Sequence, residues 1–194
     1  MPKTEKVLAR GRIFTLVQEE QPDGRIFEIA RRAPGVRVII ADKQNGRVLL
    51  TKEFRRELQA HDYRLPGGKV FDLLEDSERF RQNGGEIQEA AEKQAKIEAL
   101  EEAGIDIKRL QLVQKSTLGT TVEWDLYFFE ALEWQPHKDG QQLKENEVDH
   151  ISGFDFYDYD TVTKMIMAGD MSEERAALIL LRWIKAQQGE EAAE

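Results

Sequence analysis

Cysteine is absent from the 194-residue chain. This absence excludes a disulfide framework, a thiolate nucleophile and a zinc site with cysteine ligands, and it fits a reducing compartment. Histidine is scarce as well: His61, His137 and His150 are the only three, and their spacing is not that of metal ligands. Any metal-binding role would therefore depend on oxygen ligands, which carboxylates supply.

Long apolar runs are also missing. No stretch approaches the roughly 20 apolar residues that cross a bilayer, and residues 1–14 contain no signal-peptide core, so we expect a cytoplasmic protein without membrane contact. The net charge of −9 disfavours binding to a nucleic-acid backbone, which requires a basic surface. An acidic chain that handles phosphate needs local arginines or a bridging divalent cation. The 40% hydrophobic content is enough for a core in one large domain or in one domain with a small appendage.

Turn and strand signals organise the N-terminal half of the chain. A Pro-Asp-Gly turn and an Asn45-Gly46 turn each separate two β-rich runs, which is typical of hairpins. We expect these hairpins over residues 12–31 and 36–54, a bend with consecutive glycines over 64–70, and a polar excursion or loose helix over 72–85.

The C-terminal half combines helices with two alternating strands. Residues 86–103 are strong helix formers, and Gly104 stands where a left-handed C-terminal cap belongs. We expect strands over residues 105–116 and 121–134, a polar loop over 136–150, and helices over 158–168 and 172–188, the last with Ser172 as N-cap. These patterns predict a chain of the α+β class.

Three glutamates share one face of the helix expected over residues 86–103. Glu98, Glu101 and Glu102 are three or four positions apart or adjacent, so their carboxylates are neighbours and repel by about 0.2–0.5 kcal/mol per pair. Glu89 lies about half a turn away around the helix axis. Water can screen such a face, and acidic helix faces are common. The alternative is that a cation binds there.

The residues around these glutamates favour the cation. The upstream Leu-Pro-Gly-Gly bend has a backbone that can approach an ion closely. Oxygen ligands suit a hard cation, Mg²⁺ or Mn²⁺, and magnesium held by carboxylates is typically paired with substrate phosphates. The predicted chemistry is therefore a metal-assisted attack on a phosphate or pyrophosphate.

The stretch "EALEEAGI" (residues 98–105) resembles the second half of the Nudix hydrolase signature at every fixed position. Glu89 stands where the earlier glutamate of the signature belongs, and Gly68 of "LPGG" where its first glycine belongs. The order of "KEFRRE", "LPGG", the glutamate helix, "STLGTTVEW", "ENEVD" and "LLRW" is similar to that in ADP-ribose and nucleoside-diphosphate-sugar pyrophosphatases. The resemblance implies an α+β fold, a Nudix-type α/β/α sandwich with a mixed sheet and an N-terminal β-hairpin extension.

Two features depart from the signature. Ile97 replaces an arginine that orients the glutamates in the family by ion pairing. Lys93 or Lys96 could partly substitute for it, but a lysine lacks the planar fork of arginine. In addition, Gly68 lies 29 positions before Ile97, which is 15 more than in the signature. The extra residues include Phe80 between two arginines, which either touches the substrate or belongs to a surface helix.

The resemblance also implies roles for individual acids. In the sugar-nucleotide branch of the family, a glutamate on a loop after the strands activates water or binds metal, and Glu145 and Glu147 of "KENEVD" match that pattern. Glu145 is the first choice of general base. The alternative is that both are solvated loop acids without a catalytic role. Among the helix acids, two are main metal ligands and the third supports or orients them. The implied metal ligands are Gly67 through its carbonyl, Glu98, Glu102 and Glu147, and the implied catalytic residues are Glu101 and the base Glu145.

Arginines are the implied substrate contacts. Arg55, in "EFRRE", resembles the arginine that the family directs at substrate phosphate, and Arg56 follows it at the same strand end. Arg31 and Arg32 resemble residues near the nucleotide. The alternative for each of these residues is that it is a surface arginine without a role in substrate binding. Aromatic residues in strands either stack a base or, more often, belong to the core; those available are Phe27, Trp124 and Trp134.

The implied function is Mg²⁺-dependent (or Mn²⁺-dependent) hydrolysis of the pyrophosphate of a nucleoside diphosphate sugar. ADP-ribose, giving AMP and ribose 5-phosphate, is the favoured substrate, and GDP-mannose or another nucleotide sugar is the alternative. A catalytically weak Nudix-fold nucleotide-binding module is the alternative function. Ile97 favours that module, whereas the three repelling carboxylates oppose it.

The resemblance divides the chain into three parts. Residues 1–34 would form an N-terminal β-hairpin region that serves as the dimerisation element of a homodimer. Residues 35–189 would form the catalytic domain, and residues 190–194 a disordered tail.

Overall fold

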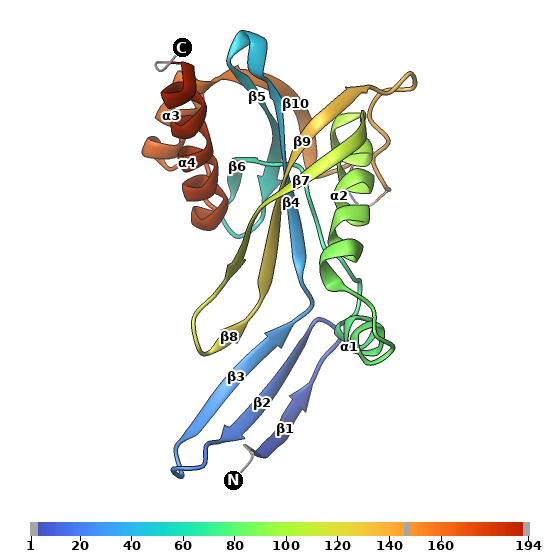
Figure 1. The fold of residues 1–194 in the computed structure, drawn as a ribbon, viewed down its shortest axis with the longest axis vertical. Coiled ribbons are helices and arrows are strands. Elements are labelled where there is room, and N and C mark those ends of the chain that lie inside the picture. The colour runs from blue at the N-terminus through green and yellow to red at the C-terminus, as the bar shows by residue number, and fades with distance from the viewer. Residues whose placement is uncertain (1–3, 146–147, 192–194) are drawn as a thin grey trace.

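The computed structural model describes residues 4–145 and 148–191, which form two β-sheets and four α-helices (Figure 1). The strands are β1 (Thr4–Arg10), β2 (Phe14–Glu20), β3 (Ile26–Arg32), β4 (Gly35–Asp42), β5 (Arg47–Arg55), β6 (Ala60–Arg64), β7 (Ile105–Thr117), β8 (Val122–Glu123), β9 (Asp125–Pro136) and β10 (Ile151–Asp158). The α-helices are α1 (Leu74–Gln82), α2 (Ile87–Ala103), α3 (Tyr159–Ala168) and α4 (Glu174–Glu191), and a 3-10 turn covers Lys43–Asn45.

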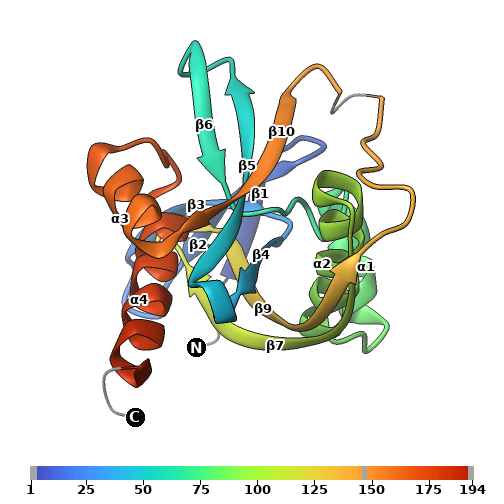
Figure 2. The same ribbon diagram turned by 90° about the horizontal axis from the view of Figure 1, so that it is seen from above.

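A mixed sheet forms the centre of the molecule, with strands in the order β10-β5-β4-β9-β7 and with β6 paired to β5. β4 and β9 run parallel, whereas the other neighbouring strands are antiparallel. Figure 2 shows α2 on one side of this sheet and α3 with α4 on the other. A separate apolar core cluster lies under each helical layer. The α/β/α sandwich implied by the signature is thereby confirmed.

Small residues let α2 lie close against the sheet. A stripe of alanines at every fourth position, from Ala91 to Ala103, is buried. Glu98 and Glu102 each precede one of these alanines, so packing of the stripe turns both carboxylates toward the interior. The helix ends at Gly104 in the left-handed conformation, with φ of 61°, as the sequence predicts.

β4 and β5 separate soon after their connecting turn, since only two residue pairs join them. The chain that returns from β6 fills the gap along the first half of β4. The N–H groups of Val36 and Val38 donate to the carbonyl oxygens of Gly68 and Pro66, each at 2.9 Å. We call residues 66–69 the glycine strap. The strap therefore lies beside β4 on the side where β5 has moved away.

The N-terminal residues contribute to a second sheet, which lies below the central one in Figure 1. The hairpin expected over residues 12–31 is present as β2 and β3. β1, which the sequence did not predict, adds a third antiparallel strand, and β8 pairs parallel to β3. Every residue of β1 is exposed. The proposed boundary at residue 34 stays a prediction.

The inserted segment between the strap and α2 contains the short helix α1. Phe80 of α1 packs on Phe71, with ring centroids 5.3 Å apart, at the edge of the core under α2. The N–H group of Leu74 donates to the carbonyl oxygen of Arg12, which joins α1 to the N-terminal sheet. Phe80 is thus a packing residue, and the surface-helix interpretation of the insertion agrees with the structure.

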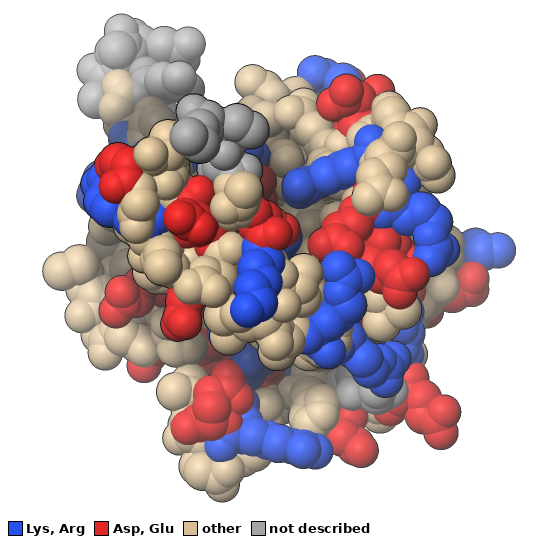
Figure 3. Space-filling model, turned by 90° about the horizontal axis from the view of Figure 1, so that it is seen from below, with Lys and Arg blue, Asp and Glu red and all other residues tan. Residues whose placement is uncertain are grey.

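Within residues 4–145 and 148–191, no helix is long and apolar enough to cross a membrane. Figure 3 views the molecule from the end that carries the N-terminal sheet. Basic and acidic side chains are interspersed on this face, and neither sign dominates it. The face in view therefore differs from the basic stripe that binds a nucleic-acid backbone.

Candidate functional site

A cleft of about 730 Å³ opens between the glycine strap, the C-terminal half of α2 and the start of α4. Six basic and five acidic side chains line it. A neighbouring lobe of about 410 Å³ shares Glu53, Arg55, Glu57 and Glu102 with the cleft and extends to His150. The carboxylate of Glu102 therefore lies where the two lobes meet. A volume of this size is typical of small-molecule sites.

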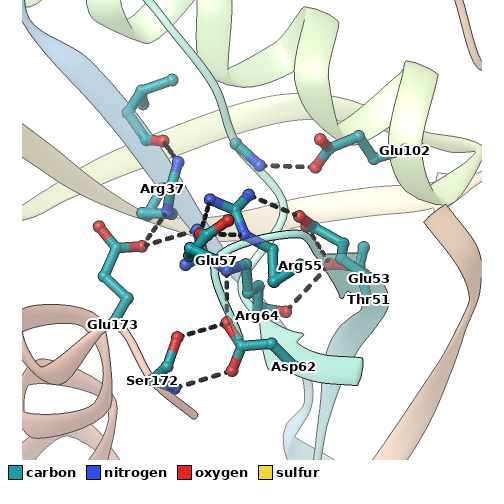
Figure 4. A network of polar contacts seen from close by, with 12 residues as sticks. Arg37, Thr51, Glu53, Arg55, Glu57, Asp62, Arg64, Glu102, Ser172 and Glu173 are labelled. Atoms are coloured by element: carbon teal, nitrogen blue, oxygen red, sulfur yellow. Dashed lines mark hydrogen bonds and ion pairs between the residues drawn. The ribbon is translucent and has the colours of Figure 1, made fainter. Parts of the chain in front are cut away.

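Glu98 and Glu102 are both buried, with exposed fractions of 5% and 6%; Glu102 lines the cleft, and Glu98 lies behind Gly68 of the strap. Glu102 accepts a hydrogen bond of 2.8 Å from the N–H group of Gly67 (Figure 4). Burial, followed by the charges of Glu53 and Glu98, raises the pKa of Glu102 well above its usual range. A bound cation would relieve this repulsion, so the arrangement fits a cation site.

Glycine is required at both central positions of the strap. A Cβ atom at Gly67 would lie 2.1 Å from the carbonyl oxygen of Val36, and its φ of +152° is one that L-residues rarely adopt. A Cβ atom at Gly68 would lie 2.2 Å from Oε1 of Glu98. The bare backbone therefore lets the strap contact both buried glutamates of α2.

The ligands available at this corner suit a hard divalent cation. They are two buried carboxylates and the peptide groups of the strap, which offer the oxygen ligands that Mg²⁺ and Mn²⁺ prefer. Among the residues that the structure describes, no three Asp, Glu or His side chains are already grouped around one metal position. Mg²⁺ needs only one or two carboxylates because it retains several water ligands. Glu147, another implied ligand, lies outside the described residues, and the roles of Gly67, Glu98 and Glu102 as ligands stay predictions.

Gln94 supports Glu98 in place of the signature arginine. Its Nε2 atom donates a hydrogen bond of 2.8 Å to Oε1 of Glu98, one helical turn later. Ile97, at the arginine position, is 45% exposed. Lys96 donates to a backbone carbonyl of β7 instead of reaching the carboxylates, and Lys93 is exposed. A neutral amide therefore orients Glu98, which the sequence interpretation did not foresee.

Replacing Gln94 by alanine is expected to weaken Mn²⁺ binding roughly 10- to 100-fold, because a supporting hydrogen bond to a metal ligand contributes on that scale. Isothermal titration calorimetry with Mn²⁺ and no substrate measures the change. Ile97→Arg in the Gln94→Ala background is expected to restore part of the affinity by supplying a donor at the signature position. An unchanged Mn²⁺ affinity in Gln94→Ala would contradict the role of Gln94.

Glu101 contacts the loop that follows β9. Its Oε2 atom lies 2.7 Å from Nζ of Lys144, and its carbonyl oxygen accepts a hydrogen bond from the N–H group of Gln142. This pairing anchors the loop that carries Glu145, whose side chain is exposed. The structure thus places Glu101 between α2 and that loop. The catalytic roles of Glu101 and Glu145 stay predictions.

Glu53 is a carboxylate of the cleft that the sequence interpretation missed. It lies on β5 with its side chain 13% exposed, and it accepts a hydrogen bond of 3.1 Å from the Thr51 hydroxyl (Figure 4). Its charge contributes to the raised pKa of Glu102. Strand alternation was the available signal, because Glu53 and Arg55 are two positions apart and point to the same face.

Arg55 and Arg56, both predicted to bind substrate, differ in position. Arg55 lines the cleft between two carboxylates: Nε donates to Glu57 at 2.8 Å, and Nη1 lies 3.6 Å from Glu53 (Figure 4). Arg56 is exposed and lines the smaller lobe. Substrate phosphate would therefore have to compete with glutamates for Arg55.

Arg31 and Arg32, at the end of β3, also have different neighbours. Hydrogen bonds to Glu5 and Glu123 hold Arg31 at the junction of three strands and raise its pKa. Arg32 lines the cleft, and its guanidinium carbon lies 4.3 Å from the centroid of the Trp124 ring. Of the two, Arg32 is the one placed for contact with a ligand in the cleft.

Two further arginines of the cleft, Arg37 on β4 and Arg64 on β6, were not predicted. Arg37 donates to Glu173 at 2.8 Å, and Arg64 lies 3.7 Å from the same carboxylate (Figure 4). Burial alone would raise the pKa of Glu173, but Arg37 and Arg64 hold it below its usual range. Asp62 accepts hydrogen bonds from Arg64 and from the N–H and hydroxyl groups of Ser172. α4 begins at Glu174, and the carbonyl oxygen of Glu173 accepts the hydrogen bond from the N–H group of Ala177, so the prediction of Ser172 as its N-cap was wrong by one position.

The aromatic residues considered for base stacking are distributed over the molecule. Trp134 donates its indole N–H to the carbonyl oxygen of Ala41 and stacks on Phe156, with centroids 5.5 Å apart. Phe27 lies on β3 next to Arg25. Trp124 is the one of the three that lines the cleft.

Comparisons with known proteins agree with this architecture. A family model described as the NUDIX domain matches residues 31–179. The chain is also similar to a crystal structure of an ADP compounds hydrolase, with 18% sequence identity and a TM-score of 0.65 over 95% of this chain and 93% of that chain. At that identity the likeness concerns the fold. No curated protein sequence matches the chain.

Proposed function

Because the chain belongs to the Nudix family of hydrolases, we propose that it cleaves the pyrophosphate bond of a nucleoside diphosphate sugar in the cytoplasm. ADP-ribose is the favoured substrate, with Mg²⁺ or Mn²⁺ as the cofactor. The observation that carries the proposal is the buried pair Glu98 and Glu102, which lies against the glycine strap beside the cleft that Glu102 lines. Paired carboxylates beside several arginines suit a phosphate ester that is bound together with a cation.

In this proposal Glu98 and Glu102 would hold the cation, and the Gly67 N–H group fixes the orientation of Glu102. The bound cation would neutralise charge that develops on the phosphoryl oxygens. Water attacks one phosphorus, the bond from that phosphorus to the bridging oxygen breaks, and Glu145 accepts the proton of the water. Glu53 is the alternative base because it lines the cleft together with Glu102. The products from ADP-ribose are AMP and ribose 5-phosphate.

Two observations support the choice of substrate over its alternatives. The motif order resembles that of ADP-ribose pyrophosphatases, and the structural neighbour is described as an ADP compounds hydrolase. GDP-mannose or another nucleotide sugar is the alternative substrate, since Ile97 and the inserted helix α1 mark a divergent member. A weak nucleotide-binding module is the alternative function, but burying two repelling carboxylates has no evident use in a pure binder.

A substrate panel tests this function. ADP-ribose, GDP-mannose, NADH and diadenosine polyphosphates are each incubated with the protein and Mg²⁺, and the products are separated by chromatography. ADP-ribose is expected to show the highest kcat/KM and to yield AMP. Turnover of none of the four classes would overturn the hydrolase proposal.

We also propose that the protein is a homodimer joined through the N-terminal sheet. Strands β1 to β3 and their turns expose a group of large apolar side chains, which marks a contact surface. These residues are Val7, Leu8, Ile13, Phe14, Leu16 and Ile26.

Leu16→Glu is expected to convert the dimer to a monomer in sedimentation velocity, because it would place a charge in the apolar contact. Met167→Glu on α3 is the matched control, since Met167 is 76% exposed and distant in sequence from the N-terminal sheet. A wild-type protein that sediments as a monomer at assay concentration would contradict the dimer.

A further inference from the structure

Four arginines gather at the end of the cleft formed by β3, β4, β6 and the start of α4. Arg37 and Arg64 share the carboxylate of Glu173, and Arg64 also pairs with Asp62. The remaining two arginines, Arg32 and Arg175, approach the Trp124 ring, each with its guanidinium carbon 4.3 Å from the ring centroid. One buried carboxylate, Asp62, and one partly buried carboxylate, Glu173, therefore face four guanidinium groups at this end of the cleft.

Among residues 4–145 and 148–191, no carboxylate is bound to the guanidinium group of Arg32 or of Arg175. Within the described part of the chain, the guanidinium group of Arg32 has neither a hydrogen bond nor an ion pair and contacts only the rings of Phe14 and Trp124. The hydrogen bonds that Arg175 makes to described residues go to backbone, to the carbonyl oxygens of Ser116 and Trp124. Burial lowers the pKa of both guanidinium groups, and the charge of nearby Arg37 lowers it further, although Glu173 opposes this. Positive charge is thus in excess beside the indole ring.

Two buried donors at this position have no hydrogen-bond partner among the described residues. They are Nη2 of Arg175 and the indole Nε1 of Trp124. Buried donors are nearly always paired in folded proteins, so two orphans on adjacent side chains require an explanation. Both side chains line the cleft, and so does Arg32. The two orphaned atoms themselves are closed off by their neighbours, so an acceptor that enters the cleft meets the guanidinium groups of Arg32 and Arg175 first and reaches the orphaned donors after a small shift of these side chains.

The other acids nearby do not neutralise this corner. Asp125 attracts Arg175 at a distance, but its carboxylate is already paired with Lys115 and hydrogen-bonded by Thr117. Glu174 lines the cleft with an exposed side chain. A multiply charged anion is the ligand that best balances two guanidinium groups and an indole N–H.

We propose that Arg32, Arg175 and the indole N–H of Trp124 form a phosphoryl-binding subsite that works independently of the carboxylates Glu98 and Glu102. This subsite rests on the proposed function only for the identity of its ligand, a phosphoryl group of the nucleotide substrate or product. A base is not the ligand of this ring, because the guanidinium groups already cover it. Base stacking on Trp124, which the sequence left open, would have to displace an arginine.

Isothermal titration calorimetry in EDTA tests the subsite with AMP as the phosphoryl probe and adenosine as its uncharged counterpart. Wild-type protein is expected to bind AMP more tightly than adenosine. Arg175→Met and Arg32→Met are each expected to weaken AMP binding at least about tenfold, which corresponds to about 1.4 kcal/mol, with no change for adenosine. Trp124→Phe, which keeps an aromatic ring but lacks the N–H group, is expected to weaken AMP binding less.

Arg109→Met is the matched control, because Arg109 is an exposed arginine on β7 paired with Glu133. Circular dichroism checks that each variant is folded. If Arg175→Met unfolds, Arg175→Lys replaces it. Lysine keeps the positive charge but lacks the planar guanidinium group, so weaker AMP binding is still expected. AMP affinity that is unchanged in the Arg175 and Arg32 variants would overturn the subsite. Because EDTA removes divalent metal, the calorimetry tests the subsite separately from hydrolysis. If the protein shows no turnover but binds AMP in a way that depends on Arg175, the subsite is supported and only the hydrolase proposal is overturned.

Discussion

Glu102→Gln is expected to reduce ADP-ribose hydrolysis on the order of 10²–10³-fold while making the metal-free protein more stable. Both effects follow from the position of one carboxylate, which is buried beside Glu53 and Glu98. Glutamine has the same shape and can still accept the hydrogen bond from Gly67, but it carries no charge to repel its neighbours or to bind a cation. Steady-state assays with Mg²⁺ and thermal unfolding in EDTA measure the two effects.

The gain in stability has a defined pH dependence. Because the pKa of Glu102 is raised in the folded protein, the folded state binds this proton more tightly than the unfolded state does. The contribution of Glu102 therefore favours folding at low pH and is lost as the pH rises from about 4.3 through the raised pKa. In EDTA, the melting temperature of Glu102→Gln is expected to exceed that of wild type by a few degrees at about pH 8 and by less at about pH 5.

Glu92→Gln is the matched control for Glu102→Gln. Glu92 lies on the same helix, but its side chain is 44% exposed and its nearest ion-pair partner, Lys96, is 3.9 Å away. This variant is expected to keep wild-type activity and the wild-type pH profile of stability. Near-normal hydrolysis by Glu102→Gln would mean that the metal site lies elsewhere, and parallel stability profiles for Glu102→Gln and wild type would contradict the raised pKa.

Gly68→Ala is expected to lower kcat/KM about 10²-fold, because a displacement of about 1 Å in a catalytic group has an effect of that size. The added methyl group would lie 2.2 Å from Oε1 and 2.7 Å from Cδ of Glu98. The strap cannot retreat freely, since the carbonyl oxygen of Gly68 accepts a hydrogen bond from Val36 on β4. Glu98 must therefore move, and the loss of Mn²⁺ affinity that follows can be measured by calorimetry.

Gly119→Ala provides the comparison for Gly68→Ala. A Cβ atom at Gly119 would have no heavy atom within 4 Å, so this substitution is expected to leave kcat/KM and Mn²⁺ affinity unchanged. Thermal unfolding of both variants separates a local effect at the metal site from a general loss of stability. Wild-type activity in Gly68→Ala would show that the close contact between the strap and Glu98 is dispensable.

Helix α2 could be predicted almost to the residue, whereas β1 could not be predicted at all. The expected helix over residues 86–103 differs from the observed Ile87–Ala103 by one position, because helix propensity and the Gly104 cap act over a few neighbouring residues. β1 has every side chain exposed, so its sequence shows no alternation of apolar and polar residues. It forms because β2 offers it an edge to pair with.

The partner of Glu98 was within reach of the sequence, but it was overlooked. Gln94 lies four positions before Glu98 on the same helix, a spacing at which side chains meet. The signature has an arginine at position 97, which made the cations Lys93 and Lys96 the expected substitutes, whereas the structure shows the neutral amide of Gln94 in contact with Glu98. Local spacing made Gln94 a candidate, but only the tertiary structure showed that Gln94, and not a neighbouring lysine, contacts Glu98.

The sequence by itself determined the α+β class, the common helix that carries Glu98 and Glu102, and the glycines of the strap, because each depends on residues that are close along the chain. Only the tertiary structure decided which other charged side chains line the cleft together with Glu102. Glu53 comes from β5 and Arg175 from α4, and their distances to the cleft depend on how separate strands and helices pack. Periodic patterns report on one element at a time, so no local pattern could show that unpaired donors gather in the cleft.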